Sequence, residues 1–285
     1  MFVPKVHRYI GKFMVLPRDH VNAFVVELEN SVVVVDSTLA LSNSLELRQL
    51  AESFGKPIEA VLLTHGHPDH WGGFVSFADL PRLGSQGAED FAREEDRVKS
   101  PTATMYLGED WPAEHIFLTD IIKDGFSTTF GGVTFTFTDL GPGESPSDGM
   151  WSFQADGIKH VFTGDSVAYQ CHCFFRDGHA LEWLKLLDRL ERDLDFSKTK
   201  MWFGHGEVPG GKNVIDWQRG YINSFVDSVK RIGDRTLPVP RSIQEQVLAD
   251  MQTYLPGEAT LFLLDYEMDI TLQNYYKQFA ERGLI

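Results

Sequence analysis

The hydrophobic pattern of the first third of the chain predicts alternating strands and helices. Two β-branched runs, residues 21–28 and 32–36, flank a short polar turn and predict a β-hairpin. Residues 44–54 carry leucines at helical spacing, and Gly55 suits the end of a helix there. Residues 60–64 form a continuous apolar run, which is typical of a strand buried on both faces.

The pattern weakens over residues 74–130 and becomes regular again afterwards. The weak stretch holds charged and proline-containing pieces, which predict one or two helices and a long surface excursion over an active site. Valine and phenylalanine then alternate with threonine over residues 133–138, as in a strand. Similar patterns predict further strands at residues 151–154, 160–163 and 200–203, and a helix at residues 181–194.

Helical spacing dominates the chain after residue 212. One broad apolar face covers residues 214–229. Ser242 and Glu245 have the spacing of a capping box and predict the start of a second helix. A third apolar pattern ends near Gly283.

Composition fits a folded globular protein with a sizeable core. The chain has 285 residues, of which 42% are hydrophobic and 24% charged, which excludes disordered and fibrous classes. Its longest apolar runs are far too short to span a bilayer. We therefore predict an α/β core in residues 1–212 and a C-terminal helical extension, residues 213–285, packed on that core.

Net charge and cysteine content narrow the partners and the compartment. The formal net charge is −15, which repels nucleic-acid phosphates and anionic lipid, so we expect a small-molecule substrate and neither nucleic acid nor membrane as a partner. Two cysteines, Cys171 and Cys173, make no disulfide framework and are expected to be buried free thiols. The first ten residues lack a basic-then-apolar segment, so we expect a cytoplasmic protein.

Four candidate metal ligands follow the predicted strand that ends at residue 64. His65 and His67 are two residues apart, so in extended chain they point the same way and can hold one ion. Asp69 and His70 suit a second ion, and Gly66 allows the backbone to turn tightly between the first two histidines. Imidazole and carboxylate ligands without thiolate favour zinc, with iron or manganese as alternatives.

At this motif the chain resembles the metallo-β-lactamase superfamily, over most of residues 20–210. The run at residues 64–70, Thr-His-Gly-His-Pro-Asp-His, resembles the signature of that superfamily. The resemblance implies an αββα sandwich with the site at one edge of the paired sheets. It also implies that Asp165 bridges two metals, that His205 is the last histidine ligand, and that Asp36 orients ligands through hydrogen bonds.

One position departs from the family pattern. Glu144 stands where the family usually carries a histidine ligand, and a glutamate ligand occurs there in the alkylsulfatase branch of the superfamily. A carboxylate can ligate zinc at a similar distance, so we predict that Glu144 completes the first site. Asp148 is a weaker candidate that otherwise caps the following turn. The competing interpretation is that Glu144 points away and the site holds one metal or is degenerate.

These residues predict a metal-dependent hydrolase. A metal-bound hydroxide is a nucleophile near neutral pH and would attack a small ester, lactone, thioester or amide. Asp69 would orient this nucleophile and pass a proton to the leaving group. Tyr169 and His172, in the loop after Asp165, are candidates to hold an oxyanion or a substrate group, and both could equally be packing residues. The homoserine-lactone lactonases of the superfamily also carry a tyrosine in that loop.

Two other interpretations use the same fold and stay open. One is a redox enzyme with a single iron, and the other is a non-catalytic member that binds a metal or ligand. Pocket walls are expected from aromatic residues of segment 105–111 and from the C-terminal helices.

Overall fold

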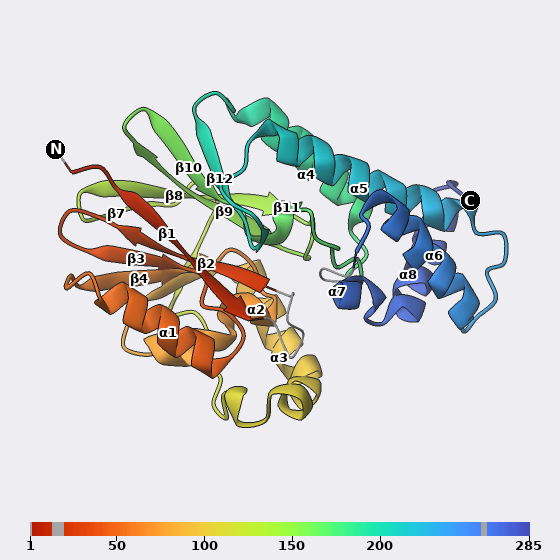
Figure 1. The fold of residues 1–285 in the computed structure, drawn as a ribbon, viewed down its shortest axis with the longest axis horizontal. Helices are drawn as coiled ribbons and strands as arrows, with labels where there is room; N and C mark the ends of the chain where they lie inside the picture. Colours follow the sequence, from red (N-terminus) through yellow and green to blue (C-terminus); the bar gives the residue numbers. More distant parts are fainter. Residues whose placement is uncertain (1, 13–19, 258–260) are drawn as a thin grey trace.

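Two mixed β-sheets face each other in the computed structural model, which describes residues 2–12, 20–257 and 261–285 (Figure 1). The first sheet has the strand order β1 (Lys5–Lys12), β2 (His20–Glu27), β3 (Val32–Val35), β4 (Ile58–Leu62), β5 (Arg82–Ser85) and β6 (Asp120–Ile122). The second has the order β12 (Thr199–Trp202), β10 (Ile158–Phe162), β9 (Asp148–Ala155), β8 (Val133–Gly141) and β7 (Ser127–Phe130). A short parallel pair, β11 (Ala168–Tyr169) and β13 (His205–Gly206), lies beside them.

Helices cover the outer faces of both sheets. Figure 1 shows α1 (Leu41–Glu52) beside the first sheet, and α4 (Ala180–Asp193) and α5 (Lys212–Arg231) beside the second. The chain is thus an αββα sandwich with additional C-terminal helices, as the sequence resemblance implies. The remaining helices are α2 (Pro68–Trp71), α3 (Gln86–Leu107), α6 (Arg241–Tyr254), α7 (Leu261–Asp265) and α8 (Met268–Glu281), with 3₁₀ turns at Gly72–Phe77, Gly108–Asp110 and Gly164–Ser166.

Side chains from both sheets fill the space between them. Phe24 and Leu62 of the first sheet belong to one apolar cluster with Phe135, Trp151 and Phe162 of the second. The alternation of phenylalanine and threonine in β8 explains this, because every second side chain of a strand points to the same face. Because the two apolar faces pack closely against each other, the ends of the strands, which carry the candidate ligands, are held in fixed positions.

The C-terminal helices share a core with the second sheet. Apolar residues of α5, α6 and α8 form one cluster with α4 and with Val161 and Met201 of the sheet. No helix within the described ranges is long and apolar enough to cross a membrane. The boundary after residue 212 stays a prediction.

Several elements match the sequence-based predictions. The hairpin is confirmed, since β2 and β3 pair antiparallel. The predicted strands near residues 60, 133, 151, 160 and 200 are β4, β8, β9, β10 and β12. The predicted helices are α1, α4, α5, α6 and α8, with ends shifted by a few residues.

Two predictions need correction. The weak stretch at residues 74–130 contains the helix α3, but it also contributes the strands β5, β6 and β7, which are too short to show a period. The capping box is wrong: α6 begins at Arg241 after Pro240, without a side-chain cap. Glu245 instead forms an ion pair with Arg241, 3.3 Å away.

Candidate metal centre

The candidate ligands lie where strands of both sheets end. His65 and His67 follow β4, and Asp69 lies in the short helix α2 directly after them. Asp165 follows β10 of the second sheet, and His205 follows β12. Because β10 and β12 are parallel neighbours, their carboxyl ends bring these last two side chains to one edge of the sandwich.

The first group of ligand atoms consists of His65, His67 and Glu144. Their ligand atoms all lie within 4.8 Å of one another, and all three residues are buried. The Oε2 atom of Glu144 is 2.8 Å from Nδ1 of His67 and 3.6 Å from Nε2 of His65. Glu144 therefore points into the group and not away from it, and its role as a metal ligand stays a prediction.

The second group consists of Asp69, His70, Asp165 and His205, again buried and within 4.8 Å of one another. The Nε2 atom of His205 is 3.2 Å from Asp69 and 3.0 Å from Asp165. The other oxygen of Asp165 lies 3.3 Å from Nε2 of His70. Asp165 also reaches the first group, with 3.9 Å between its Oδ2 atom and Nε2 of His65.

These donor sets fit divalent cations. Imidazole nitrogens and carboxylate oxygens without thiolate are ligands for zinc, manganese or iron. His70 Nε2 and Asp165 Oδ1 are buried, yet within the described residues neither makes a well-aligned hydrogen bond. A cation between the converging atoms would satisfy both, since buried charged groups need a partner. The two groups joined by Asp165 form a candidate dinuclear site.

Hydrogen bonds fix the orientation of two of the ligand rings. Asp36 lies 2.8 Å from Nδ1 of His70, and it also accepts the backbone N–H of Thr64. Asp36 has a left-handed backbone, with φ of 59°, which is uncommon for a residue other than glycine. Nδ1 of His205 donates to the carbonyl of His20 at 2.6 Å. In both rings this contact leaves Nε2 directed at the ligand cluster.

Two glycines make room around the ligands. A Cβ atom on Gly204 would collide with Oδ1 of Asp165, so only glycine fits beside this carboxylate. Gly66 is needed for a different reason from the tight turn that the sequence analysis predicts. It does not have the positive φ of a tight glycine turn; its missing side chain allows close approach of α3, whose Ala88 carbonyl would lie 2.6 Å from a Cβ atom.

Asp177 contacts a candidate ligand that the sequence analysis did not connect with it. Its Oδ2 atom lies 3.0 Å from Nε2 of His67, on the side of the ring opposite Glu144. This contact holds the ring proton on Nε2 and leaves Nδ1 to face the ligand group. Asp177 lies 110 residues beyond His67 in the chain, so no local spacing could indicate the contact.

Removing the Asp177 carboxylate should weaken metal binding at the first group. We expect Asp177→Ala to raise the dissociation constant of the ion at the first group about 10- to 100-fold, because His67 loses the partner that sets its tautomer. Asp177→Asn, which keeps an acceptor, should lose less. Competition with a chelating dye measures both constants, and Asp188→Asn on the surface is the control. Unchanged affinity in Asp177→Ala would contradict this role.

Mutual contacts shift the pKa values of the ligands. Burial alone lowers the pKa of His70, but Asp165, Asp69 and Asp36 outweigh burial and raise it well above its usual range. Burial alone raises the pKa of Asp165, but His205 and His70 reverse the sign and hold it well below its usual range. The pKa values of His67 and His205 are raised in the same way, whereas burial and the neighbouring His70 hold the pKa of His65 well below its usual range. At neutral pH the metal-free cluster therefore carries extra protons on His67, His70 and His205, and a bound cation would displace them.

The other two predicted catalytic residues, Tyr169 and His172, are not among the residues that line the main cavity. Tyr169 packs edge-on against Trp217, with 5.5 Å between ring centres, and is not among the residues that line the main cavity. His172 is buried, and its Nδ1 atom lies 2.8 Å from the Tyr221 hydroxyl. It lines a smaller cavity beside Asp165, together with Cys171 and Cys173, which are buried free thiols as predicted. Catalytic roles for Tyr169 and His172 stay predictions.

Asp148 does not belong to either ligand group. Its Oδ2 atom accepts the backbone N–H of Glu144 at 2.8 Å, and its Oδ1 atom accepts the Ser145 hydroxyl at 2.7 Å. Asp148 thus shapes the preceding turn, which presents Glu144, and not the following turn that the sequence analysis expected it to cap.

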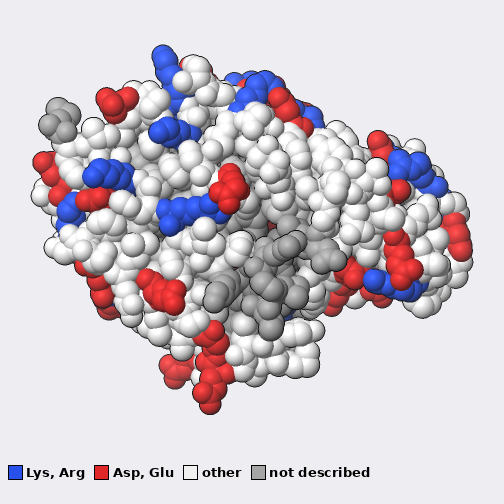
Figure 2. Space-filling view, viewed as in Figure 1, with Lys and Arg blue, Asp and Glu red and all other residues white. Residues whose placement is uncertain are grey.

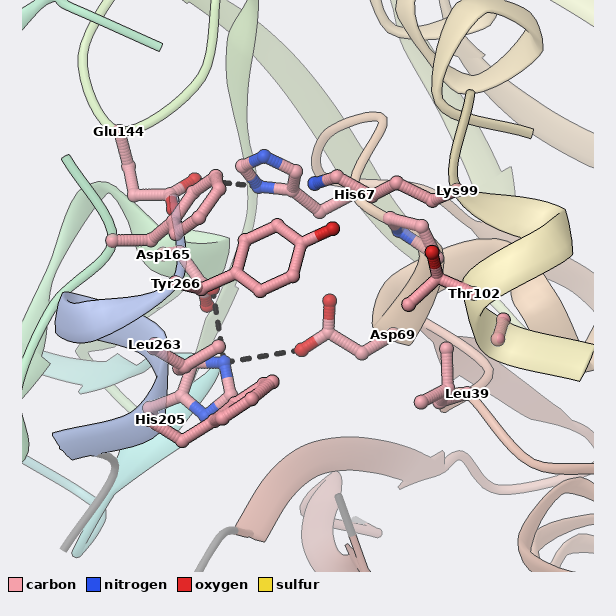
Figure 3. A pocket seen from close by; sticks show the side chains of 14 residues that line it. Leu39, His67, Asp69, Lys99, Thr102, Glu144, Asp165, His205, Leu263 and Tyr266 are labelled. Carbon is pink, nitrogen blue, oxygen red and sulfur yellow. Dashed lines mark ion pairs between the residues drawn. The ribbon is translucent and has the colours of Figure 1, made fainter. Parts of the chain in front are cut away.

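A cavity opens beside the ligands, and Figure 3 shows its lining. Its open space is about 650 Å³ including the mouth. His67, Asp69, Glu144, Asp165 and His205 form one part of its wall. The C-terminal helices contribute as predicted, through Phe262, Leu263 and Tyr266. Segment 105–111 does not line this cavity: Trp111 packs on Trp71 instead, with 6.1 Å between ring centres.

Comparison with known families identifies this arrangement. The model of the Metallo-beta-lactamase superfamily matches residues 16–205, which is more than half of the chain. That range contains every residue of the two ligand groups.

Curated relatives are distant in sequence. A linear primary-alkylsulfatase from Pseudomonas sp. is 23% identical over 251 residues, 74% of this chain and 46% of the relative. A beta-lactamase-like protein 2 homolog from Caenorhabditis elegans is 25% identical over 162 residues, 57% of this chain and 47% of the relative. The chain thus spans about half the length of these two relatives.

Solved structures share the fold. A metallo-beta-lactamase from Pontibacter korlensis aligns with a TM-score of 0.61 and 16% identity, over 78% of this chain and 95% of its own. A metallo-beta-lactamase from Hirschia baltica aligns with a TM-score of 0.54 and 16% identity, over 77% and 93% of the two chains. At this identity the likeness is one of architecture.

Proposed function

The chain belongs to the metallo-beta-lactamase superfamily, and from this premise we propose that it is a hydrolase dependent on two metal ions, with zinc as the preferred metal. The observation that carries the proposal is the pair of buried ligand groups that share Asp165 beside a cavity. A protein without metal chemistry would have no reason to bury seven imidazole and carboxylate side chains in one cluster.

Each ligand group has a role in the proposed reaction. Bound cations supply Lewis acidity and lower the pKa of water to about 7, which makes hydrolysis feasible at neutral pH. Asp69 faces the cavity and lies 3.2 Å from His205, so it can take the proton of the attacking water and pass it to the leaving group. Asp36 and Asp177 keep the rings of His70 and His67 in place through hydrogen bonds.

We propose a small ester, lactone, thioester or amide as the substrate. The cavity beside the ligands is largely lined by apolar side chains, which suit an apolar substrate. The net charge of −15 argues against a polyanionic substrate, and Lys and Arg side chains on the face in Figure 2 are interspersed with Asp and Glu. A cytoplasmic location and the absence of nucleic-acid or membrane partners are parts of the same proposal.

Hydrolysis of a sulfate ester is a second candidate. The relative with the longest match given above is a linear primary-alkylsulfatase. Glu144 occupies the position at which the superfamily usually carries a histidine, and it points into the first ligand group. A single-iron redox enzyme and a non-catalytic metal-binding protein remain the alternatives from other functional classes.

Metal content and a substrate panel together test the proposal. We expect about two zinc ions per chain by elemental analysis, and turnover of at least one member of a panel of lactones, carboxylic esters, thioesters and alkyl sulfates. Removal of the metal by a chelator should abolish turnover, and added zinc should restore it. One iron per chain would favour the redox enzyme, and no stoichiometric metal would favour the binding protein.

A further inference from the structure

The cavity beside the ligands has an apolar wall with a few polar atoms. Part of this wall comes from α3 and from the segment around α7, which lie far apart in the sequence, and Phe174 in it packs edge-on against the ring of His67. Such a wall suits a hydrocarbon chain, since each buried methylene group contributes about 0.8 kcal/mol. The apolar members of the lining are Leu39, Pro68, Ala103, Phe174, Phe262 and Leu263.

Lys99 of α3 places an ammonium group in this apolar wall. Its side chain is 22% exposed, and its Nζ atom lies 4.7 Å from the centre of the Phe174 ring. Within the described residues, its ion pair is with Glu95, one helical turn earlier. An ammonium group has three donors, so this pair leaves donor capacity for a further partner. Lysine is rare in buried positions unless it is paired or functional.

Two hydroxyl groups accompany this ammonium. Thr102 lies one turn further along α3, and its side chain lies beside the hydroxyl of Tyr266. Figure 3 shows the Tyr266 hydroxyl directed towards the wall that carries Lys99 and Thr102. Lys99, Thr102 and Tyr266, here called the donor cluster, all line the cavity. Because Thr102 and Tyr266 hydrogen-bond to each other, the cluster offers the ammonium and one further hydroxyl donor, which match the two oxygens of a carboxylate.

Five carboxylates lie near the donor cluster, and metal loading would offset them. Asp69, Glu144 and Asp165 belong to the ligand groups, and Glu95 and Asp177 act on the Lys99 ammonium. Two divalent cations and this ammonium would balance the five negative charges when the imidazoles are neutral. Asp177 contacts His67, and Glu95 is the ion-pair partner of Lys99. Among the described residues that line the cavity, Lys99 is the one Lys or Arg.

We propose that the donor cluster binds a carboxylate at the far end of the substrate, so that the preferred substrates are apolar esters or amides with a second, anionic end. This inference rests on the proposed hydrolytic function for the bond that is cleaved. The ester group would lie at the metal-loaded ligand groups, and the apolar wall would hold the hydrocarbon chain. Lys99 would select the carboxylate at the other end of that chain. Lys99 is thus proposed as a specificity-determining residue.

Paired substrates test this selection. The probes are 4-nitrophenyl monoesters of glutaric and suberic acids, each compared with the same ester whose far carboxyl is capped as a methyl ester. We expect the wild type to have at least a tenfold higher kcat/KM for the carboxylate member of one pair, which is typical of a charged hydrogen bond. Lys99→Met should reduce this ratio to about one, and Lys99→Arg should keep most of it.

A binding measurement separates this inference from the proposed hydrolysis. In the zinc-loaded protein, we compare dissociation constants of dicarboxylates of four to eight carbons with those of the monocarboxylates of equal length. A dicarboxylate of the right length should bind at least tenfold more tightly in the wild type and in the surface control Lys185→Met, and about equally in Lys99→Met. If no ester is hydrolysed but this difference is found, the proposed function fails and the carboxylate site stands.

Two results would overturn the carboxylate site. One is a wild-type protein that shows no preference for the second carboxylate in either measurement. The other is a Lys99→Met variant that keeps the wild-type preference while its thermal stability falls, which would assign Lys99 only to the ion pair with Glu95 in α3.

Discussion

Replacing Asp165 by asparagine should cause the largest loss of activity of any single substitution. We expect kcat/KM to fall at least about a thousandfold and the metal content to fall below two per chain. Asp165 is the residue through which the two ligand groups meet, 3.0 Å from His205 and 3.9 Å from His65. Two cations held by these groups would repel each other, and the negative charge of the Asp165 carboxylate would offset part of that repulsion.

Asparagine suits this test because it keeps the volume of the side chain. Gly204 packs directly against Asp165, so a larger residue would disturb the backbone as well as the charge. The control is Glu89→Gln, which removes another buried carboxylate that lies outside both ligand groups. It should keep two metals and most of the activity, with circular dichroism and thermal unfolding showing that both variants fold. Wild-type turnover in Asp165→Asn would refute the proposed mechanism.

The sequence could predict most of the ligands because their signal is local. Four of them, His65, His67, Asp69 and His70, lie within six residues after an apolar strand. Asp165 and His205 each follow a strand as well, and their order along the chain resembles the family pattern. Ligand residues at the ends of strands can therefore be predicted without a structure, since the strand fixes the direction of the side chains that follow it.

Contacts between distant segments could not be predicted in the same way. Asp177 meets His67 across 110 residues, and neither position indicates the other in the sequence. Tyr266 reaches the cavity because α7 packs near α3, which depends on how the C-terminal helices dock. Lys99 belongs to a helix that reads as a solvated charged segment, and only the fold shows that its side chain enters an apolar wall. Substrate selectivity depends on such contacts.

Glu144 combines both kinds of information. The sequence marks it as a departure from the family pattern, and the structure places it 2.8 Å from Nδ1 of His67. Burial raises the pKa of Glu144 to about 8. Burial alone would lower the pKa of His67, but the carboxylates of Glu144 and Asp177 outweigh burial and raise this pKa well above its usual range. In the metal-free protein this pair therefore holds a proton at neutral pH. A cation at the first group must displace that proton, so its apparent affinity should rise with pH up to about 8.

Glu144→Ala should accordingly lower the metal content to about one ion per chain, because the first group then keeps only His65 and His67. The second group, with four ligands of its own, should keep its ion. Glu144→Gln should also weaken the first ion, and the rise of its affinity between pH 6 and 8 should be less steep than in the wild type. Glu89→Gln again serves as the control for loss of a buried carboxylate. Two ions per chain in Glu144→Ala, at unchanged affinity, would show that Glu144 is not a ligand and that the first site is completed by other groups.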